Sequence, residues 1–366
     1  MNPLVSLPER NLNILRTLAV GYVLVDHTVL TFREANVWRN IGFMGVCLFF
    51  VHTSLVLMGS IDRMVREFNK DDLNQAGTRF RIVMSFYIRR ALRIYPLSVV
   101  TILACLVLQI PFSTLLANAG DPQAPHRTWQ VIVANLLLVQ NLFGANDVTG
   151  VLWSLPLEVQ MYLFLPFAYL LVRAGGRYVV AGLAAAIAGG LVLYLFKTDI
   201  RFIWRLSVLS YAPCFMSGVL AYYLLKVKRW KQLPAWTWPL VVLAWGAFCM
   251  VVLGFNHSTI ERSSWPFCIG IGCLIPLVRN MKDSALTRGA DSVARYSYGV
   301  YLLHLPVIAI SFLWLKAPTM LVNWLVYGFL ICALPVLAFR FIEDPFVRLG
   351  RKWTSGNASR PRLANQ

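Results

Sequence analysis

Long hydrophobic segments separated by short polar ones occupy almost the whole chain. A helix needs about 20 predominantly apolar residues to cross a bilayer. Segments of this kind occur at 12–32, 41–61, 95–115, 153–173, 178–196, 206–226, 236–255, 296–314 and 320–341. The segment 265–279 is shorter but has the same character. The pattern predicts an all-α fold, a polytopic membrane helix bundle of about ten transmembrane helices.

One apolar segment does not fit this pattern. Residues 129–143 read WQVIVANLLLVQNLF, which is short for a span and contains two asparagines and two glutamines. Apolar stretches of about 10–14 residues are typical of re-entrant or interfacial structure. We therefore expect a short re-entrant or interfacial segment near 129–143.

The basic residues predict the orientation of the bundle. If 129–143 does not cross and the N-terminus is cytoplasmic, 26 of the 34 lysines and arginines lie on the cytoplasmic side, many of them in a large loop at 62–94. If that segment crossed, the basic residues that follow it would face outward, against the positive-inside rule. Both termini are therefore predicted to be cytoplasmic.

Composition agrees with a membrane protein. The chain is 58% hydrophobic and 14% charged, whereas soluble domains have about 25% charged residues. A net charge of +18 would suit nucleic acid on a water-exposed basic domain, and the sequence predicts no such domain. Membrane lipids are the expected surroundings, and no nucleic acid partner is expected.

The predicted organisation is one transmembrane domain over 1–352 followed by a disordered cytoplasmic tail at 353–366. Neither an appended soluble domain nor a cleaved signal peptide is predicted. The seven cysteines lie in apolar segments without the spacing of a zinc site. We interpret them as packing residues and expect no bound metal.

Two ionisable residues of the first segment share a helix face. Arg16 and His27 are eleven residues apart, which at 100° per residue is about three turns and at 1.5 Å per residue about 16 Å. Asp26 precedes the histidine. Ionisable residues within a membrane usually face a polar cavity. The alternative is that Arg16 extends to the interface and His27 is a structural histidine.

A cluster of arginines precedes the segment that begins near residue 95. The stretch FYIRRALRIYPL (86–97) places Arg90 and Arg93 at i, i+3, on one face of a helix. Two guanidinium groups at a membrane mouth suit phosphate or pyrophosphate recognition. Positive-inside anchoring explains one or two of these charges equally well.

A third group of polar residues lies in WSLPLEVQMYLFLP (153–166). Ser154, Glu158 and Tyr162 recur every four residues and form a polar stripe at the predicted outer face. At the depth of His27, Glu158 is expected to orient that histidine as a base. His304, within YSYGVYLLHLP (296–306), is interpreted first as a structural hydrogen-bonding residue. Glu343 and Asp344 are expected to pair with arginines.

The motifs together resemble the acyltransferase-3 family of integral membrane O-acyltransferases, in a stand-alone form without a fused hydrolase-like domain. The resemblance covers nearly the whole chain. It rests on RTLAVGYVLVDH (16–27), FMGVCLFFVHTS (43–54), FYIRRALRIYP (86–96), WSLPLEVQMYLFLP (153–166), YSYGVYLLHLP (296–306) and RFIEDP (340–345). The chain departs from the family where it reads FFVHTSL at 49–55 instead of FFVLSGF, which loses a glycine expected to permit close helix packing.

The resemblance implies an enzyme of the bacterial inner membrane. Its donor substrate would be cytoplasmic acyl-CoA, with acetyl as the default acyl group and no permanently bound cofactor. The acceptor would be a hydroxyl of a glycan or glycolipid outside the cytoplasm, as in polysaccharide O-acetylation. His27 and Glu158 would be catalytic, Arg16, Arg90 and Arg93 would bind acyl-CoA, and further residues would line the pocket: Asp26, Ser154, Tyr162 and His304. The alternative is a transporter or flippase of a lipid-linked sugar, with the polar stripe as its pathway.

Overall fold

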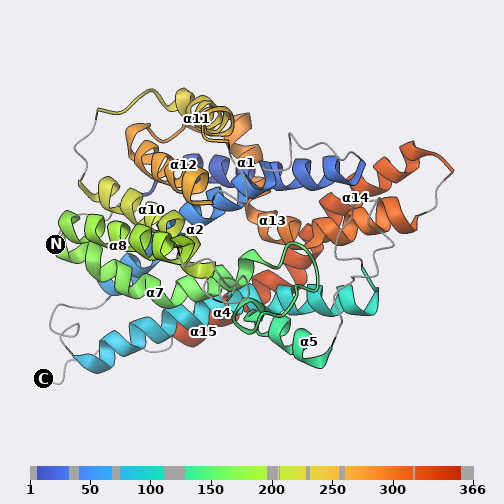
Figure 1. The fold of residues 1–366 in the computed structure, drawn as a ribbon, viewed down its shortest axis with the longest axis horizontal. Helices are drawn as coiled ribbons and strands as arrows, with labels where there is room; N and C mark the ends of the chain where they lie inside the picture. The colour runs from blue at the N-terminus through green and yellow to red at the C-terminus, as the bar shows by residue number, and fades with distance from the viewer. Residues whose placement is uncertain are drawn as a thin grey trace, which may run out of the picture.

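The computed structural model describes residues 6–32, 41–67, 75–110, 128–195, 205, 207–227, 231–254, 260–315 and 318–355. Within these ranges the chain is helical, without a β-strand and with one isolated bridge, between Leu233 and Val278. The helices are α1 (Glu9–Phe32), α2 (Ile41–Arg66), α4 (Ala76–Val107), α5 (Trp129–Leu136), α6 (Gln140–Phe143), α7 (Ser154–Ala174), α8 (Gly176–Leu195), α10 (Ser207–Val227), η2 (Ala235–Thr237), α11 (Trp238–Val252), α12 (Ile260–Leu274), η4 (Ile275–Leu277), α13 (Ala285–Ile308), η5 (Ala309–Trp314), α14 (Met320–Ala338), η6 (Phe339–Glu343) and α15 (Asp344–Ser355). Figure 1 shows them gathered in one bundle. The predicted all-α fold is confirmed.

Most of these helices can cross a membrane. In the described part of the chain, 8 are long and apolar enough: α2, α4, α7, α8, α10, η2 with α11, α13 with η5, and α14 with the helical residues that follow it. α12 with η4 is apolar but shorter. α1 has 24 residues, which at about 1.5 Å per residue exceeds a hydrocarbon core of about 30 Å. Together these helices correspond to the segments predicted from the sequence, and the polytopic bundle is confirmed.

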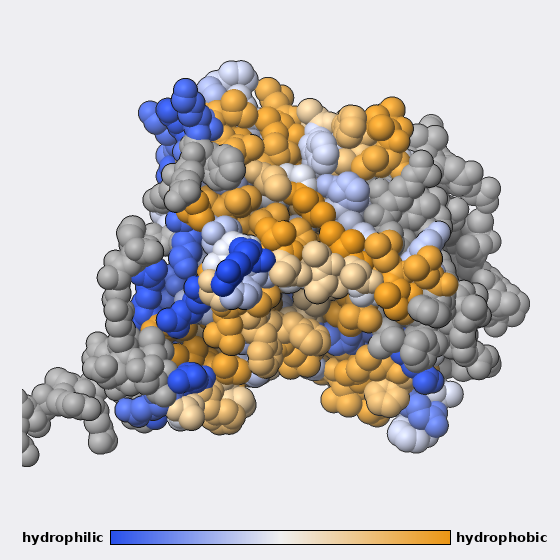
Figure 2. All heavy atoms as spheres, turned by 60° about the vertical axis from the view of Figure 1, so that its left-hand side comes forward, coloured by the Kyte–Doolittle hydropathy of each residue, from blue (hydrophilic) through white to orange (hydrophobic). Residues whose placement is uncertain are grey.

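The most extensive packing between helices in the described bundle involves α1, α2, α10 and α13. α1 packs on α2 and α13, while α10 packs on α2, α8 and α12. α2 is the most enclosed span, with 78% of its apolar window buried against 11% for α14. Large apolar side chains such as Phe167, Val251 and Phe329 are exposed. Figure 2 shows the resulting hydrophobic surface, with most strongly hydrophilic residues toward its left-hand margin, as expected of a lipid-facing bundle.

Close packing around FFVHTSL does not need the missing glycine. Gly218 of α10 lies directly against Val51 and Ser54 of α2, where a Cβ atom would collide with the backbone and with the serine hydroxyl. Ser54 itself donates a hydrogen bond to the Phe50 carbonyl oxygen at 2.8 Å. A small residue on the facing helix therefore provides the close approach.

The expectation of a large loop at 62–94 is wrong. α2 continues to Arg66 and α4 already begins at Ala76, so most of this basic region is helical. Arginine is a good helix former, and apolar residues between the arginines, including Ile82 and Phe86, are buried against the bundle. Tertiary burial of one face thus extends the helix beyond the segment that hydropathy alone detects.

Residues 129–143 form a short hairpin, which confirms the re-entrant or interfacial prediction. α5 has 8 residues, about 12 Å at 1.5 Å per residue. Leu138 then adopts a positive φ of 53° and turns the chain into α6. Asn135 joins the two limbs, because its amide donates to the Asn146 carbonyl oxygen at 2.9 Å and its own oxygen accepts from the Val148 N–H at 3.0 Å.

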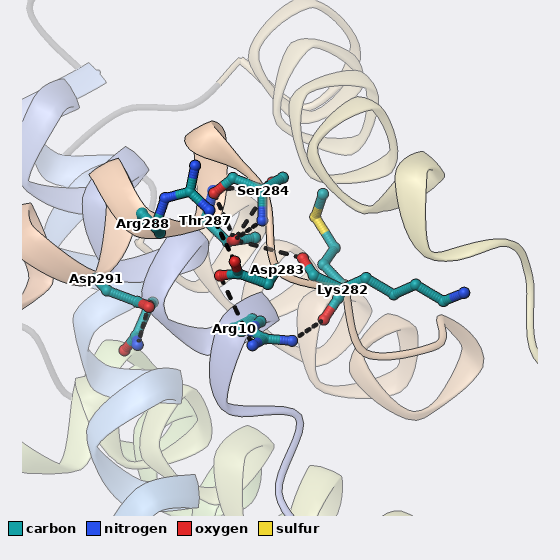
Figure 3. Close-up of polar contacts among 9 residues, drawn as sticks. Arg10, Lys282, Asp283, Ser284, Thr287, Arg288 and Asp291 are labelled. Carbon is teal, nitrogen blue, oxygen red and sulfur yellow. Dashed lines mark hydrogen bonds and ion pairs between the residues drawn. The ribbon is translucent and has the colours of Figure 1, made fainter.

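α1 and α13 are fastened together at the end where both begin, as Figure 3 shows. Arg10 forms an ion pair with Asp283 at 3.8 Å, and Asn13 donates to Asp291 at 2.7 Å. Ser284 caps α13 in a capping box. These contacts fix the register of two parallel helices whose histidines, His27 and His304, lie about 20 Å further along.

The same end of the bundle collects other basic segments. The end of α2 and part of α4 meet α15 around one cavity. α15 continues through Ser355, three residues into the predicted tail 353–366, and Thr354 accepts a hydrogen bond from Arg89 Nε at 2.6 Å. Residues 356–366 lie outside the described ranges. The convergence agrees with the predicted topology, although which side is cytoplasmic stays a prediction.

Candidate active site

The basic vestibule is a cavity of about 410 Å³ at this end of the bundle. Its arginines come from three helices: Arg63 of α2, Arg89, Arg90 and Arg93 of α4, and Arg351 of α15. The volume lies in the range of about 300–1,000 Å³ that is usual for small-molecule sites. Several guanidinium groups on one cavity suit a multiply phosphorylated ligand. Arg63 and Arg351 escaped the sequence analysis because they are remote from Arg90 in the chain.

Arg93 connects the vestibule to the interior. Its Nη1 atom forms an ion pair with Glu343 Oε2 at 2.8 Å, and the glutamate is only 1% exposed. The guanidinium also lies 5.8 Å from the centre of the Tyr298 ring. The expected pairing of Glu343 and Asp344 with arginines is confirmed, since Asp344 pairs with Arg348 at 2.6 Å.

Beyond Arg93 lies a second, smaller cavity, the Arg16 cavity, of about 60 Å³. Arg16 and Glu158 both line it. Glu158 accepts a hydrogen bond from the Tyr162 hydroxyl, and Arg16, Arg90 and Arg93 are close enough to act on it electrostatically. Among the described residues, no ion pair within 4.0 Å joins Glu158 to an arginine.

One hydrogen-bond donor of Arg16 has no acceptor among the described residues of this cavity. Its Nε atom is buried and has no hydrogen-bond partner among the described residues. A buried N–H group without a partner costs roughly 1–3 kcal/mol, so an acceptor atom placed in the cavity would relieve the cost. The alternative in which Arg16 simply extends its guanidinium to the interface does not account for this buried donor.

A third cavity, the His27 cavity, also of about 60 Å³, follows along α1. Asp26, His27 and Trp153 line it. His27 Nδ1 lies 3.0 Å from the Val23 carbonyl oxygen and 3.3 Å from Nε2 of His304. The two imidazole rings are therefore direct neighbours within the bundle.

Tyr301 separates the Arg16 and His27 cavities and lines both. Its hydroxyl donates to the Val151 carbonyl oxygen at 2.9 Å, so the contact at 2.6 Å with Ser154 is one in which the serine donates to the tyrosine oxygen. Ser154 and Tyr301 belong to two of the motifs quoted above, 153–166 and 296–306. The Arg16 and His27 cavities thus follow one another along α1. The vestibule is lined by α2, α4 and α15, and Arg93, which lines it, lies against Tyr298 of the Arg16 cavity.

The structure gives Glu158 different neighbours from those expected. The sequence analysis places it beside His27, whereas it lies with Tyr162 and the arginines. The residue found beside His27 is His304. Ser284 is a recognisable helix cap, and a helix that starts there places His304 almost as far from its first residue as His27 is from the start of α1. The similar depth of the two histidines in the bundle could therefore have been predicted. The predicted segment 296–314 omitted the first turns of α13 and so misjudged this depth.

One cluster could offer metal ligands. The Sγ atoms of Cys47, Cys214 and Cys268, from α2, α10 and α12, lie within 4.8 Å of one another. Two of these thiols donate to backbone carbonyl oxygens: Cys214 to Ser264 at 3.9 Å and Cys268 to Cys47 at 3.7 Å. Such contacts are those of protonated, packed cysteines. Sequence spacing could not reveal the cluster, because its members come from three separate helices.

The site defines a class of protein: a polytopic helical membrane protein in which a basic vestibule leads toward two histidines in direct contact. The chain belongs to the acyltransferase-3 family, whose acyltransferase domain matches residues 9–340. It is 27% identical over 297 residues to nodulation protein 10 of Rhizobium leguminosarum bv. viciae, covering 72% of this chain and 76% of that protein. No solved structure is significantly similar to it. The protein is therefore a membrane acyltransferase.

Proposed function

We propose that the protein transfers an acyl group, by default acetyl, from cytoplasmic acyl-CoA to a hydroxyl of a glycan or glycolipid outside the cytoplasm. The observation that carries this proposal is the series of three cavities within the bundle, from the vestibule with five arginines, through the Arg16 cavity, to the cavity beside His27 and His304. The proposed sites of anion recognition and of base chemistry are thus separate cavities of the bundle. That separation suits a donor whose phosphates and reactive thioester are joined by a long arm.

The basic vestibule is the proposed site for the CoA phosphates. Arg90 and Arg93 act as fixed cations, and Arg63 and Arg351 extend the cluster across neighbouring helices. Bidentate guanidinium–phosphate bonds are charge-assisted and directional. Arg93 has the additional role of pairing with the buried Glu343.

The arm and thioester are proposed to pass Arg16 and reach His27. Arg16 Nε is a buried donor suited to an oxygen of the arm or of the thioester. Two cavities of about 60 Å³ each have space for only a few water molecules at about 30 Å³ each. Tyr301 and its neighbours must therefore move apart when the arm enters, which makes donor binding a conformational step.

The proposed chemical step uses His27 as the general base. His27 Nε2 accepts the proton of the acceptor hydroxyl while that oxygen attacks the thioester carbonyl carbon. The new C–O bond forms, the C–S bond breaks, and the proton passes to the departing CoA sulfur, which leaves as free thiol. Positioned bases of this kind contribute about 10²–10⁴-fold to a rate. Glu158 is proposed to act on the donor side, by balancing the charge of Arg16.

The transporter alternative is not favoured. The chain belongs to an acyltransferase family, and a transporter has no need for a general base beside the proposed thioester path. Release of CoA thiol separates the two functions. Purified protein in vesicles should release free thiol from acyl-CoA only when an acceptor glycan is present, and should attach the acyl group to it. Transport of the acceptor without thiol release would contradict the proposal.

The proposed location is the bacterial inner membrane with both termini in the cytoplasm. A cysteine introduced in the loop 144–150, which follows the α5–α6 hairpin, tests this orientation. It should react with an impermeant thiol reagent added to intact spheroplasts, whereas one introduced at exposed Arg81 on α4 should react only after permeabilisation. The reverse pattern would invert the topology.

A further inference from the structure

The two histidines of the site lie ring against ring. Nε2 of His304 is 3.3 Å from Nδ1 of His27, and the ring centroids are 4.9 Å apart with an interplanar angle of 53°. His304 is fully buried. The geometry is that of a nitrogen-to-nitrogen hydrogen bond between tilted rings, not of a stacked pair.

The protonation of His304 follows from its backbone contacts. Its Nδ1 atom lies 2.7 Å from the Tyr301 carbonyl oxygen and 3.2 Å from that of Val300. A carbonyl oxygen only accepts hydrogen bonds, so Nδ1 carries the hydrogen. In the neutral ring the lone pair is then on Nε2, the atom that faces His27.

The same reasoning fixes the tautomer of His27. Its Nδ1 atom lies between the Val23 carbonyl oxygen and the lone pair of His304 Nε2, both of which accept. Nδ1 therefore carries the hydrogen, and the basic lone pair of neutral His27 is on Nε2. His304 and Val23 together impose the tautomer that a general base on the proposed acceptor hydroxyl needs.

We propose that His304 is a positioning residue for catalysis: it accepts the Nδ1 hydrogen bond of His27, holds that ring in the Nε2-basic tautomer and stabilises the imidazolium formed when His27 takes the acceptor proton. This inference rests on the proposed function. No atom is gained or lost in the interaction, because the proton that enters at His27 Nε2 leaves with the CoA sulfur. His304 here performs the role that a carboxylate performs in many His-containing sites.

The surroundings favour a neutral partner for His27. Among the described residues, the ionisable groups around the pair include Asp26 on α1, Tyr301 on α13 and Tyr327 on α14, which contacts Thr28 at 2.9 Å. α2 contributes Gly42, Phe43 and Val46 to the cavity. A neutral imidazole can accept the His27 hydrogen without adding another buried charge next to Asp26.

A second contact, at the other end of α1 and α13, helps to hold the two histidines together. The bond between Asn13 and Asp291 joins the same two helices at their other end. From that bond to the histidines is 14 residues on α1 and 13 on α13, or about 20 Å along each. Parallel helices held at both ends in matching register keep the two rings in contact.

Two substitutions of similar polarity separate this role from simple packing. In His304→Gln the amide oxygen lies near the position of Nε2 and can accept from His27. In His304→Asn the shorter side chain reaches only the position of Nδ1, so it can bond the Tyr301 carbonyl but not His27. With reconstituted protein and acyl-CoA plus acceptor, we expect His304→Gln to keep kcat within about tenfold, and His304→Asn to lose at least another tenfold.

The Michaelis constant for acyl-CoA should not change in either variant, because the vestibule is remote. Equal kcat values for the two variants, or a loss confined to KM, would overturn the proposal. Detergent-solubilised size-exclusion profiles and acyl-CoA binding show that each variant is folded. If wild-type protein releases no thiol, or His27→Gln stays active, the proposed function itself fails. If His27→Gln is inactive while His304→Asn matches His304→Gln, only the role of His304 fails.

Discussion

The basic vestibule and the histidine pair differ in almost every physical respect. The vestibule is a cavity of about 410 Å³ with arginines from three helices, so its proposed function is spread over several charges. The histidine end is a cavity of about 60 Å³ in which single contacts fix single atoms. The loss of one arginine should weaken phosphate recognition without abolishing it, whereas base chemistry depends on one nitrogen. The two ends should therefore respond very differently to substitution.

The largest expected effect is at the histidine end. His27→Ala should reduce acyl transfer by about 10²–10⁴-fold, because the base is lost, and His27→Gln should be no better because an amide does not take up the proton. Acyl-CoA binding, measured by calorimetry or ligand-protected thermal shift, should persist. His52→Gln, a change at another buried histidine of the bundle, is the matched control. Loss of donor binding in His27→Ala would mean that the two ends are not independent.

Substitutions in the vestibule should act mainly on donor affinity. Arg90→Ala should weaken acyl-CoA binding about 10–150-fold, since a charge-assisted hydrogen bond contributes about 1.5–3 kcal/mol. Lysine should restore little of this, because a point charge does not reproduce the guanidinium fork. Arg81→Ala, an exposed position on the same helix outside the cavity, should have no effect. Full rescue by lysine would favour topology as the reason for Arg90.

Arg93 sharpens this test because it also holds a buried carboxylate. Arg93→Ala leaves Glu343 unpaired, and breaking a buried ion pair costs about 3–5 kcal/mol. We expect this variant to be less stable than Arg90→Ala, with a lower thermal midpoint in detergent. The double variant Arg93→Ala/Glu343→Gln should recover stability but not donor affinity. Recovery of both would show that Arg93 is structural only.

Substitution of Glu158 tests whether this residue acts with the arginines that bind the donor or with His27. Its neighbours in the structure are Tyr162 and the arginines, so Glu158→Gln should raise the Michaelis constant for acyl-CoA severalfold and change kcat less. If Glu158 instead orients His27, as the sequence alone suggests, Glu158→Gln should lower kcat and leave the Michaelis constant for acyl-CoA unchanged. Steady-state kinetics with each substrate varied in turn distinguishes the two outcomes.

The sequence predicts the bundle well and the site only in part. Helical spans follow from hydropathy because lipid imposes one length and one composition on them. The start of α4 was missed because arginines on one face lower the hydropathy of a stretch whose other face, with Ile82 and Phe86, is buried. The sequence predicted that Glu343 and Asp344 pair with arginines, which is correct, but it did not predict that the partner of Glu343 is Arg93 of α4. The neighbour of His27 was not predicted either, because it depends on the register of α1 against α13, which is set by contacts between distant residues.

The smallest expected effect concerns the loop that leads from the α5–α6 hairpin to the histidine end. Burial raises the pKa of Asp147 to about 6, although a hydrogen bond of 2.8 Å from Gln140 opposes the shift. A carboxyl group with a raised folded-state pKa binds its proton more tightly in the folded protein than in the unfolded chain. The contribution of Asp147 to the free energy of unfolding is therefore greatest below about pH 4, decreases as the pH rises to about 6, and is constant above it, with a total change of at most about 3 kcal/mol.

The variant Asp147→Asn keeps an oxygen for Gln140 and removes the ionisation, so its thermal midpoint should fall less than that of wild-type protein between pH 4 and pH 7. Acyl-CoA affinity at pH 7 should be the same for both proteins, because the vestibule is at the other end of the bundle. A variant that follows the wild-type pH dependence would show that Asp147 ionises freely in solvent.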